Sequence, residues 1–240
     1  MLFRILHQSA EFVAVDKPYG VHVHPPEDVR FRISKNENGL AILRDQMGQY
    51  VYPVHRLDRS TSGVLLYALS SEAASKLAPL FSERTLEKTY YAIVRGDSKD
   101  SGRIDSPLGE EGKTAVGAVT SFEKVSSVEL AWPNERFPTS RYSLLRINPE
   151  TGRYHQIRRH LRRENHPIIG DTQHGDGLHN RLWRAEIGRP YLFLKCYSMG
   201  FTNPFDGKPL VIRSSWNSEW MRAFDRFGVC PRNGHRPFAR

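Results

Sequence analysis

The segment at residues 55–63, with the sequence HRLDRSTSG, constrains this chain more than any other feature. It places a single carboxylate, Asp58, between Arg56 and Arg59. The apolar run at residues 64–69 is typical of a buried strand, so we expect Asp58 in the loop that enters this strand. A carboxylate at the edge of a core can act as nucleophile or base, because burial and neighbouring charges set its pKa. The alternative is a surface aspartate in an ion-paired turn, which would carry no function.

Length and composition indicate an ordinary globular protein. At 240 residues the chain can bury the core of one large domain or of two tightly joined halves. Its 39% hydrophobic and 25% charged residues fit that class. No apolar run approaches the roughly eighteen residues that a membrane span needs. The N-terminal residues lack the apolar region and cleavage site of a signal peptide, so we expect a cytoplasmic protein without membrane attachment.

The net positive charge of the chain favours a negatively charged partner. A formal charge of +9 favours binding to polyanions through their phosphates, although many basic proteins bind no nucleic acid. Cys196 and Cys230 are too few and too far apart for a disulfide framework or a zinc site. His22 and His24 fall on one face of a short alternating segment, but no third ligand follows them, so we expect no metal.

The residue pattern predicts an α+β chain that is rich in strands. Apolar and β-forming runs predict strands at residues 3–7, 12–16, 64–69, 87–96, 103–105, 116–124, 139–147, 191–197 and 209–212. Helical spacing predicts helices at residues 39–47, 70–82, 153–163 and 218–227. Ser70 is expected to cap the second helix, and Met221 to face inward on the last. Residues 172–188 are expected as a polar loop and residues 228–240 as a mobile tail.

The predicted helix at residues 153–163 carries an unusual density of positive charge. Ile157 and Leu161 are four residues apart and are expected to point inward. Arginines at the same spacing share the neighbouring faces, Arg158 with Arg162 and Arg159 with Arg163. Like charges at this spacing repel and cost helix stability. We therefore expect a negatively charged partner to relieve the repulsion.

Several separated blocks resemble the RluA-type pseudouridine synthases. Residues 55–63 resemble the family signature His-Arg-Leu-Asp-x-x-Thr-Ser-Gly. Three further blocks follow the family order: residues 16–20 (Lys-Pro-x-Gly), 88–94 (Lys-x-Tyr-x-Ala), and 151–158 with 166–171 (Thr-Gly-Arg-x-His-Gln-Ile-Arg and His-Pro-Ile-x-Gly-Asp). The resemblance runs from about residue 3 to residue 221. It implies one catalytic domain at residues 1–227, with a long, mainly antiparallel mixed sheet in two halves, helices outside and a central basic cleft.

The resemblance also implies roles for three catalytic residues. Asp58 matches the catalytic carboxylate, either as a nucleophile on the sugar or as a base that removes a ribose proton. Arg158 matches the arginine that pairs with this carboxylate and favours its ionised form. Tyr90 matches the tyrosine that stacks on the target base. The alternatives from the residues alone are a solvated arginine on a basic helix and a core tyrosine in a strand.

The remaining implied residues contact the substrate. Arg56 matches the arginine that enters the nucleic-acid stack when the target base flips out, unless it serves as an ion-pair partner of Asp58. Leu194 is expected to line the pocket, and the other arginines to hold phosphates or to form solvated surface. The whole predicted binding set is Arg56, Arg59, Leu194, Arg153, His155, Arg159, Arg162 and Arg163.

Two departures and one closer likeness refine the resemblance. Lys195 stands where the family often has histidine, and residues 202–204 read Thr-Asn-Pro where it has Thr-His-Pro. Residues 142–145, 158–161 and 174–181 look most like the TruC-type branch, which modifies uridine 65 of certain tRNAs. The implied function is cofactor-free conversion of uridine to pseudouridine in tRNA, with no obligate protein partner.

Three other functions stay open from the sequence. A ribosomal-RNA enzyme of the same family would share every motif, because surface loops set the target. A non-catalytic RNA-binding module would explain the basic charge, although it would not need Asp58, Tyr90 and Arg158 together. A metal-dependent nuclease or phosphoryl-transfer enzyme should show clustered carboxylates and lose activity with a chelator.

Overall fold

The chain folds into two compact units, and each unit contains two stretches that are separated in the sequence. The computed structural model describes residues 1–25, 33–83, 85–109 and 114–231. The first unit contains Met1–Thr89 and Lys195–Ser215, and the second contains Tyr90–Leu194 and Trp216–Arg240. The predicted single domain at residues 1–227 stays a prediction, and the predicted tail lies almost wholly outside the described residues.

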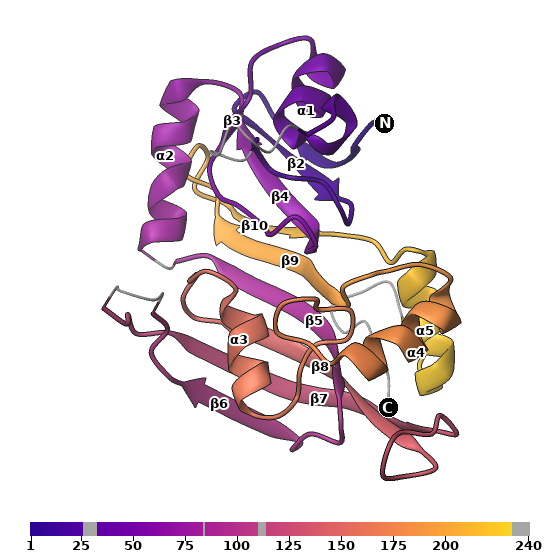
Figure 1. Ribbon diagram of the computed structural model, residues 1–240. Helices are drawn as coiled ribbons and strands as arrows, with labels where there is room; N and C mark the ends of the chain where they lie inside the picture. The colour runs from indigo at the N-terminus through magenta and orange to yellow at the C-terminus, as the bar shows by residue number, and fades with distance from the viewer. Residues whose placement is uncertain (26–32, 84, 110–113, 232–240) are drawn as a thin grey trace. The chain divides into compact units, whose positions relative to one another are not determined.

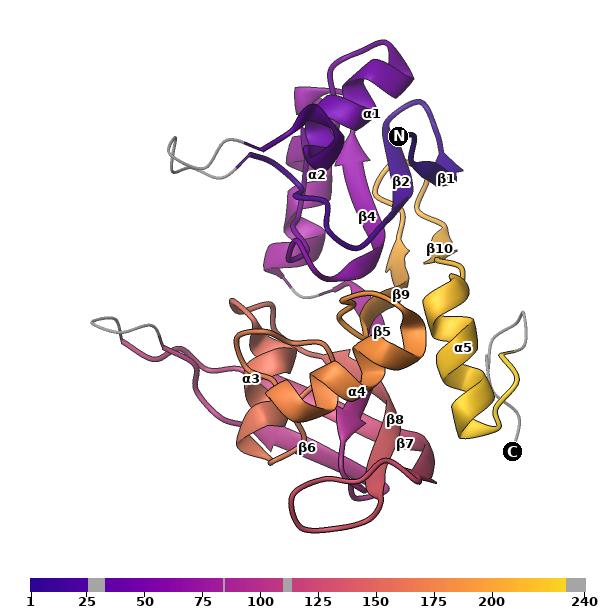
Figure 2. The ribbon, with the colours of Figure 1, turned by 45° about the vertical axis from the view of Figure 1, so that its right-hand side comes forward.

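The first unit is built on a mixed sheet (Figures 1 and 2). Its strands are β1 (Arg4–Gln8), β2 (Phe12–Lys17), β3 (Tyr52–Pro53), β4 (Ser62–Ala68), β9 (Leu194–Thr202) and β10 (Pro209–Arg213), and its helices are the 3-10 turn Lys35–Glu37, α1 (Gly39–Met47) and α2 (Ser71–Ser82). The order is β1-β2-β4-β9, with β3 paired to β4 and β10 to β9. Only β4 and β9 run parallel among these pairs.

Strand β4 forms the centre of the first unit. Every residue of β4 is buried, because β2 and β9 flank it and α2 packs against it. A strand that is covered on both faces needs a continuous apolar run, which this segment supplies. Helix α2 begins where predicted, since the hydroxyl of Ser70 accepts the N–H of Ala73 at 3.1 Å. This arrangement fixes the loop that carries Asp58 at the entrance to β4.

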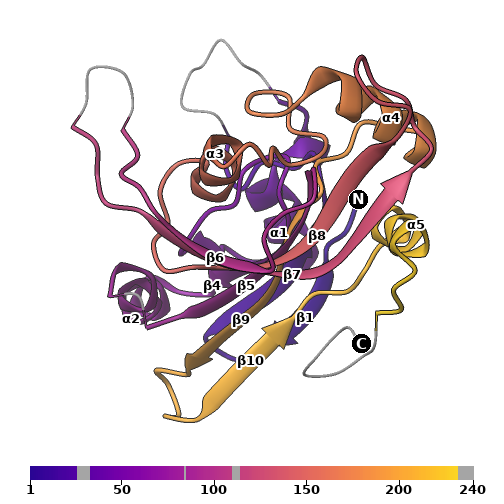
Figure 3. The same cartoon turned by 90° about the horizontal axis from the view of Figure 1, so that it is seen from below.

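The second unit is built on an antiparallel sheet with the order β5-β8-β7-β6. Its strands are β5 (Glu87–Arg95), β6 (Ser101–Asp105), β7 (Val119–Leu130) and β8 (Ser140–Pro149), and its helices are α3 (Gln156–Arg163), α4 (Gly177–Ile187) and α5 (Ser218–Phe227). Helices α3 and α4 lie over the same face of these strands (Figure 3). The first three residues of β5 belong to the first unit.

An aromatic cluster forms the core between the helices and strands of the second unit. Trp183 of α4 is 1% exposed and packs edge-on against Trp132, Tyr142 and Phe193. Such edge-to-face pairs add to the stabilisation that burial of the rings provides. The cluster therefore fixes α4 to the sheet.

The α+β class and the mainly antiparallel sheet in two halves with flanking helices are confirmed, and several local predictions are wrong. Residues 172–188 were expected as a loop but contain α4. Asp176 caps this helix by accepting the N–H of Leu178 and His179, and His179, Trp183 and Ile187 form its buried face.

Two further differences are smaller. Strand β9 begins at Leu194 instead of residue 191. Met221 is 41% exposed, because the buried face of α5 runs through Trp220, Ala223, Phe224 and Phe227. No helix within the described residues is long and apolar enough to cross a membrane.

Candidate active site

The loop that carries Asp58 is held by one hydrogen bond within itself and by one to β4. Asp58 is half-buried, and its carbonyl oxygen accepts the N–H of Thr61 at 3.0 Å. Upstream, Nε2 of His55 accepts the N–H of Leu66 at 2.9 Å, and its ring stacks on Phe81 with centroids 4.5 Å apart. Burial lowers the pKa of His55 to about 3, with Lys88 contributing. His55 is therefore neutral at physiological pH and acts as an acceptor.

A buried lysine supports the same loop from β2. Lys17 is 0% exposed, and its Nζ donates to the carbonyl oxygens of Pro18 at 3.1 Å, Val21 at 2.7 Å and Arg59 at 3.0 Å. Burial lowers the pKa of Lys17 from 10.5 to about 7, against the attraction of the Asp58 carboxylate, which raises it. A buried ammonium needs such partners, because an isolated one would be very costly. Lys17 therefore holds the backbone directly after Asp58 and supplies positive charge near it.

The two arginines that flank Asp58 differ in their surroundings. Arg59 forms an ion pair with Glu37 at 2.7 Å and donates its Nε to the carbonyl oxygen of Gly20 at 3.0 Å. Arg56 is exposed. The structure thus gives Arg59 a role in joining the Asp58 loop to the preceding turn, whereas Arg56 lies on the surface beside it. Contacts of either residue with RNA stay a prediction.

Lys195, the residue that departs from the family pattern, is also buried. It is 2% exposed, and its Nζ lies 3.3 Å from Oδ1 of Asp16. The other oxygen of Asp16 accepts the hydroxyl of Ser214 at 2.8 Å and the N–H of Ser215 at 3.2 Å. Burial lowers the pKa of Lys195, and Asp16 opposes this shift. The charge of Lys195 is thus balanced within the first unit.

In the second unit, α3 is anchored by polar side chains on its inner face. The Nε2 of Gln156 donates to the carbonyl oxygen of Val119 at 2.8 Å, and its Oε1 accepts the hydroxyl of Thr151 at 2.6 Å. His160 contacts the hydroxyl of Thr120 through Nδ1 at 2.9 Å. These bonds to β7 and to the turn before α3 stabilise a helix that its dense positive charge would weaken.

Arg158 occupies an unexpected position on α3. It is only 4% exposed, so the alternative of a solvated arginine on the basic helix is wrong. Its Nε and one terminal nitrogen donate to the two oxygens of Asp171 at 2.7 and 2.8 Å. Burial would raise the pKa of Asp171, but the hydrogen bonds from Arg158 and from the N–H of His174 lower it. Asp171 is the anion that relieves part of the charge on α3, and whether Arg158 also pairs with Asp58 stays a prediction.

His155 begins α3 in a strained conformation. Its φ of 50° lies in the left-handed region, which non-glycine residues rarely adopt and which often marks functional sites. Its ring stacks on exposed Tyr154 at 3.7 Å between centroids, and its Nδ1 lies 3.0 Å from Nε2 of His174. These contacts fix the ring directly before the helix.

The remaining arginines of the predicted binding set lie along α3 and the turn before it. Arg159 donates to the carbonyl oxygen of Gly109 at 2.6 Å, and Arg163 to the hydroxyl of Ser106 at 2.6 Å. Arg153 and Arg162 are exposed. The structure thus brings together a basic surface of Arg153, Arg159, Arg162 and Arg163.

Tyr90 and Leu194 are both buried, at 9% and 3% exposure. Tyr90 lies in β5 opposite Ile147 of β8, and Leu194 begins β9. Together with Arg158 they belong to the second unit, whereas Arg56, Asp58 and Arg59 belong to the first. The predicted residues therefore form two groups, and the predicted basic cleft between the halves stays a prediction.

Comparison with known proteins assigns the chain to a family. The family of RNA pseudouridylate synthases matches residues 11–163, and the chain belongs to this family. Its RluA-type resemblance and its expected isomerase class are thereby confirmed.

Curated relatives and solved structures agree with this class. The chain is 42% identical over 239 residues to the tRNA pseudouridine synthase C of Vibrio vulnificus, covering 94% of this chain and 96% of the relative. It is 44% identical over 236 residues to that of Vibrio parahaemolyticus, covering 93% and 94%. A solved structure named "Human RNA Pseudouridylate Synthase Domain Containing 4" has the same fold, with a TM-score of 0.70. The two sequences are 24% identical, and the match covers 93% of this chain and 92% of the human one.

Sequence reasoning missed two residues that organise the site. Lys17 and Asp171 both lie in blocks that carry the resemblance, yet neither was given a role. A lysine at the end of β2, two residues after the last residue of its apolar run, was the available signal for Lys17. Asp171 gave no comparable signal, because its partner Arg158 lies thirteen residues away on another element.

Proposed function

We propose that this protein converts a specific uridine to pseudouridine in tRNA, at uridine 65, with Asp58 as the catalytic carboxylate. One observation carries the proposal: the family motif places Asp58 in a half-buried loop that Lys17 and His55 hold in position. The tRNA substrate is inferred from the relatives named tRNA pseudouridine synthase C. A location in the cytoplasm belongs to the same proposal, because it follows from that substrate.

The reaction detaches uracil from its ribose, turns the base and rejoins it through C5. Asp58 must be ionised to act on the ribose, either as nucleophile or as base. The two side chains attract each other, because the Asp58 carboxylate raises the pKa of the nearby Lys17 ammonium. A carboxylate that is half-buried is also less screened by water than one on the surface. The immediate surroundings of Asp58 in the first unit therefore suit this role.

Tyr90 and Arg158 complete the proposed catalytic set. Tyr90 would stack on the target base, which suits an aromatic side chain that is held in a strand with a small exposed fraction. Arg158 is oriented by two bonds to Asp171, so its guanidinium has a fixed direction. Such preorganisation is useful for a residue that must meet a carboxylate during the reaction.

RNA binding would use the basic surface of α3 and the exposed Arg56. Arg153, Arg159, Arg162 and Arg163 would contact phosphates, which position the RNA without reading its sequence. Arg56 would fill the space that the flipped uridine leaves in the stack, and thereby offset the cost of unstacking. Both contributions should weaken as salt rises, because phosphate contacts release counterions.

The test is to map pseudouridine in total tRNA and ribosomal RNA from cells with and without this gene. The proposal predicts loss of one tRNA site, uridine 65, and its restoration by the wild-type gene but not by a gene that encodes Asp58→Asn. Loss of a ribosomal site instead would retain the enzyme class and overturn the substrate. Unchanged RNA in both fractions would contradict the proposal.

A further inference from the structure

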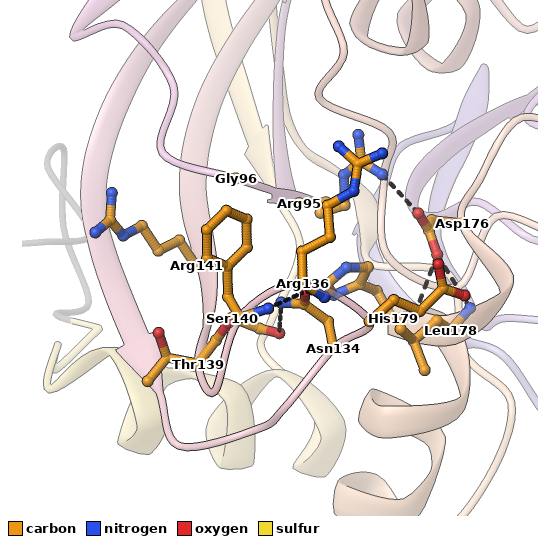
Figure 4. Close-up of a pocket in the computed structure, with 12 residues that line it drawn as sticks. Arg95, Gly96, Asn134, Arg136, Thr139, Ser140, Arg141, Asp176, Leu178 and His179 are labelled. Carbon is orange, nitrogen blue, oxygen red and sulfur yellow. Dashed lines mark hydrogen bonds and ion pairs between the residues drawn. The ribbon is translucent and has the colours of Figure 1, made fainter.

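A polar pocket of about 670 Å³ lies within the second unit, and none of the predicted catalytic residues is among those that line it. It is lined by the end of β5, the loop between β7 and β8, and the start of α4 (Figure 4). Its volume falls in the range of roughly 300–1,000 Å³ that is usual for small-molecule sites. Arg95, at one side of it, follows Tyr90 in β5 by five residues, or about 17 Å at roughly 3.4 Å per residue. A ligand here would not touch a base that is stacked on Tyr90.

The loop that presents the pocket is preformed. Oδ1 of Asn134 accepts the N–H groups of Arg136 and Phe137, both at 3.0 Å. The N–H of Asn134 donates to the carbonyl oxygen of Phe137 at 2.9 Å, and its Nδ2 donates to that of Thr139 at 2.8 Å. The loop therefore holds the backbone of its two outer residues, Arg136 and Phe137, in place before any ligand binds.

These two outer side chains have the chemistry to hold one nucleotide. Phe137 is 64% exposed, although burial of such a ring is normally favourable. Within the described residues, the Arg136 guanidinium has no ion pair or hydrogen bond, whereas Arg95 is paired with Asp176 at 2.6 Å and Arg141 with Glu129 at 2.9 Å. Aromatic faces stack on unpaired bases, and arginine binds phosphate.

A buried histidine adds a group that can contact a base edge. His179 lines the pocket, is 8% exposed and is held through Nδ1 by the hydroxyl of Tyr142 at 2.9 Å. Burial raises the pKa of Tyr142 to about 12 and lowers the pKa of His179. Both groups are therefore neutral near pH 7. When Tyr142 donates to Nδ1, the proton of His179 lies on Nε2, for which the described residues provide no partner.

We propose that this pocket binds one unpaired nucleotide of the RNA substrate, distinct from the target uridine. Arg136 holds its phosphate, Phe137 stacks on its base and His179 contacts the base edge. Glu135 and Asp176 also line the pocket, so it carries less positive charge than the surface of α3 and suits a single phosphate. The proposal rests on RNA being the substrate, and it adds a determinant of target choice outside the catalytic residues.

The first test compares the Arg136→Ala, Phe137→Ala double variant with wild type on a tRNA transcript. Arg184→Ala is the matched control, because Arg184 is exposed on α4 but does not line the pocket. For the double variant we expect KM to rise about tenfold, while kcat stays within about twofold of wild type. The slope of log affinity against log salt concentration should become shallower by about one, which corresponds to the loss of one phosphate contact. Unchanged KM and salt dependence, or an equal change in the control, would overturn the proposal.

The second test is independent of how well the double variant folds. Replacement of Phe137 by the photoreactive amino acid p-benzoylphenylalanine should give a crosslink to one tRNA nucleotide other than the modified uridine. Crosslinking to free mononucleotides but not to tRNA would overturn the proposal, as would crosslinking to the modified uridine itself. If wild type makes no pseudouridine in tRNA, the proposed function fails, whereas the crosslink still reports whether this pocket meets RNA.

Discussion

The Nζ of Lys17 lies 3.0 Å from the carbonyl oxygen of Arg59, the residue that directly follows Asp58. This contact joins the end of β2 to the loop before β4, two segments that lie far apart in the sequence. Lys17 is fully buried, so the bond is shielded from water and fixes the loop more firmly than a surface contact would. Lys17 thus both positions the loop and places positive charge near the Asp58 carboxylate.

Lys17 should make stability depend on pH above neutrality. Its pKa is about 7 in the folded protein and 10.5 when exposed, so between these values the unfolded chain binds more protons. The free energy of unfolding of wild type should therefore rise with pH from 7 to 10, relative to Lys17→Met, by at most about 1.4 kcal/mol per pH unit. Urea unfolding at pH 7 and pH 9 measures this difference. Parallel pH dependence in the two proteins would contradict it, and exposed Lys208→Met serves as the control.

Replacing only one partner of the Arg158–Asp171 pair should lower the free energy of unfolding substantially. Asp171→Asn keeps the shape of the side chain but leaves the Arg158 charge buried and unbalanced at this contact. Loss of one partner of a buried pair typically costs about 3–5 kcal/mol. We expect a loss of this order in urea unfolding, with part of it recovered in the Arg158→Met, Asp171→Asn double variant. A single variant as stable as wild type would show that the pair does not hold α3.

Gly63 should be indispensable at the end of the motif that contains Asp58. Its φ is 115°, and a Cβ atom at this position would lie 2.0 Å from the carbonyl oxygen of Cys196 in β9. Gly63→Ala should therefore force β4 and β9 apart and destabilise the first unit by about 3 kcal/mol or more. Gly48 is the matched control, because its φ is 66° but nothing lies within 4 Å of its added Cβ, so Gly48→Ala should cost only about 1–2 kcal/mol. Equal losses of thermal stability in the two variants would rule out the close approach as the cause.

His55 should make the protein sensitive to acid. Its folded pKa of about 3 lies below its unfolded value of 6.5, so the unfolded chain binds an extra proton between these values. Stability from this group is present above pH 6.5 and is lost as the pH falls, by about 2 kcal/mol between pH 6.5 and pH 5. His55→Gln retains an acceptor for the N–H of Leu66 and should lose less stability over that interval. Urea unfolding of wild type and His55→Gln at pH 7 and pH 5 measures this difference. Identical losses of the free energy of unfolding in the two proteins would refute a role of His55 in acid sensitivity.

The sequence predicted those elements whose residue pattern alone determines them. Helices α1 and α5 have the predicted bounds, and the burial of β4 follows from its continuous apolar run. Helix α4 was missed because its polar surface residues outnumber the buried face of His179, Trp183 and Ile187. The spacing of four between these three residues was the signal that could have identified it.

The sequence motifs allowed the position of Asp58 in the candidate site to be predicted. The burial of the charged residues Lys17 and Arg158 could not be predicted from them. Asp58 was placed correctly at the entrance to a strand, because the motif and the apolar run adjoin in the sequence. Arginines four residues apart on α3 looked like a uniform surface, so the burial of Arg158 was not foreseen. Burial of Lys17 and Arg158 depends on partners that other segments supply, and no local pattern reports such partners. Long-range pairing is therefore the part of the site that required the structure.

The most direct test of the central claim is single-turnover pseudouridine formation by purified wild type and Asp58→Asn on a tRNA transcript, with tRNA affinity measured in parallel. Asp225→Asn, an exposed change on α5, is the matched control. The account predicts that Asp58→Asn forms no detectable pseudouridine while binding tRNA within about threefold of wild type, which corresponds to less than 0.7 kcal/mol. Turnover by Asp58→Asn comparable to wild type would contradict a catalytic role for this carboxylate. Parallel loss of turnover and tRNA binding would assign Asp58 a structural role instead.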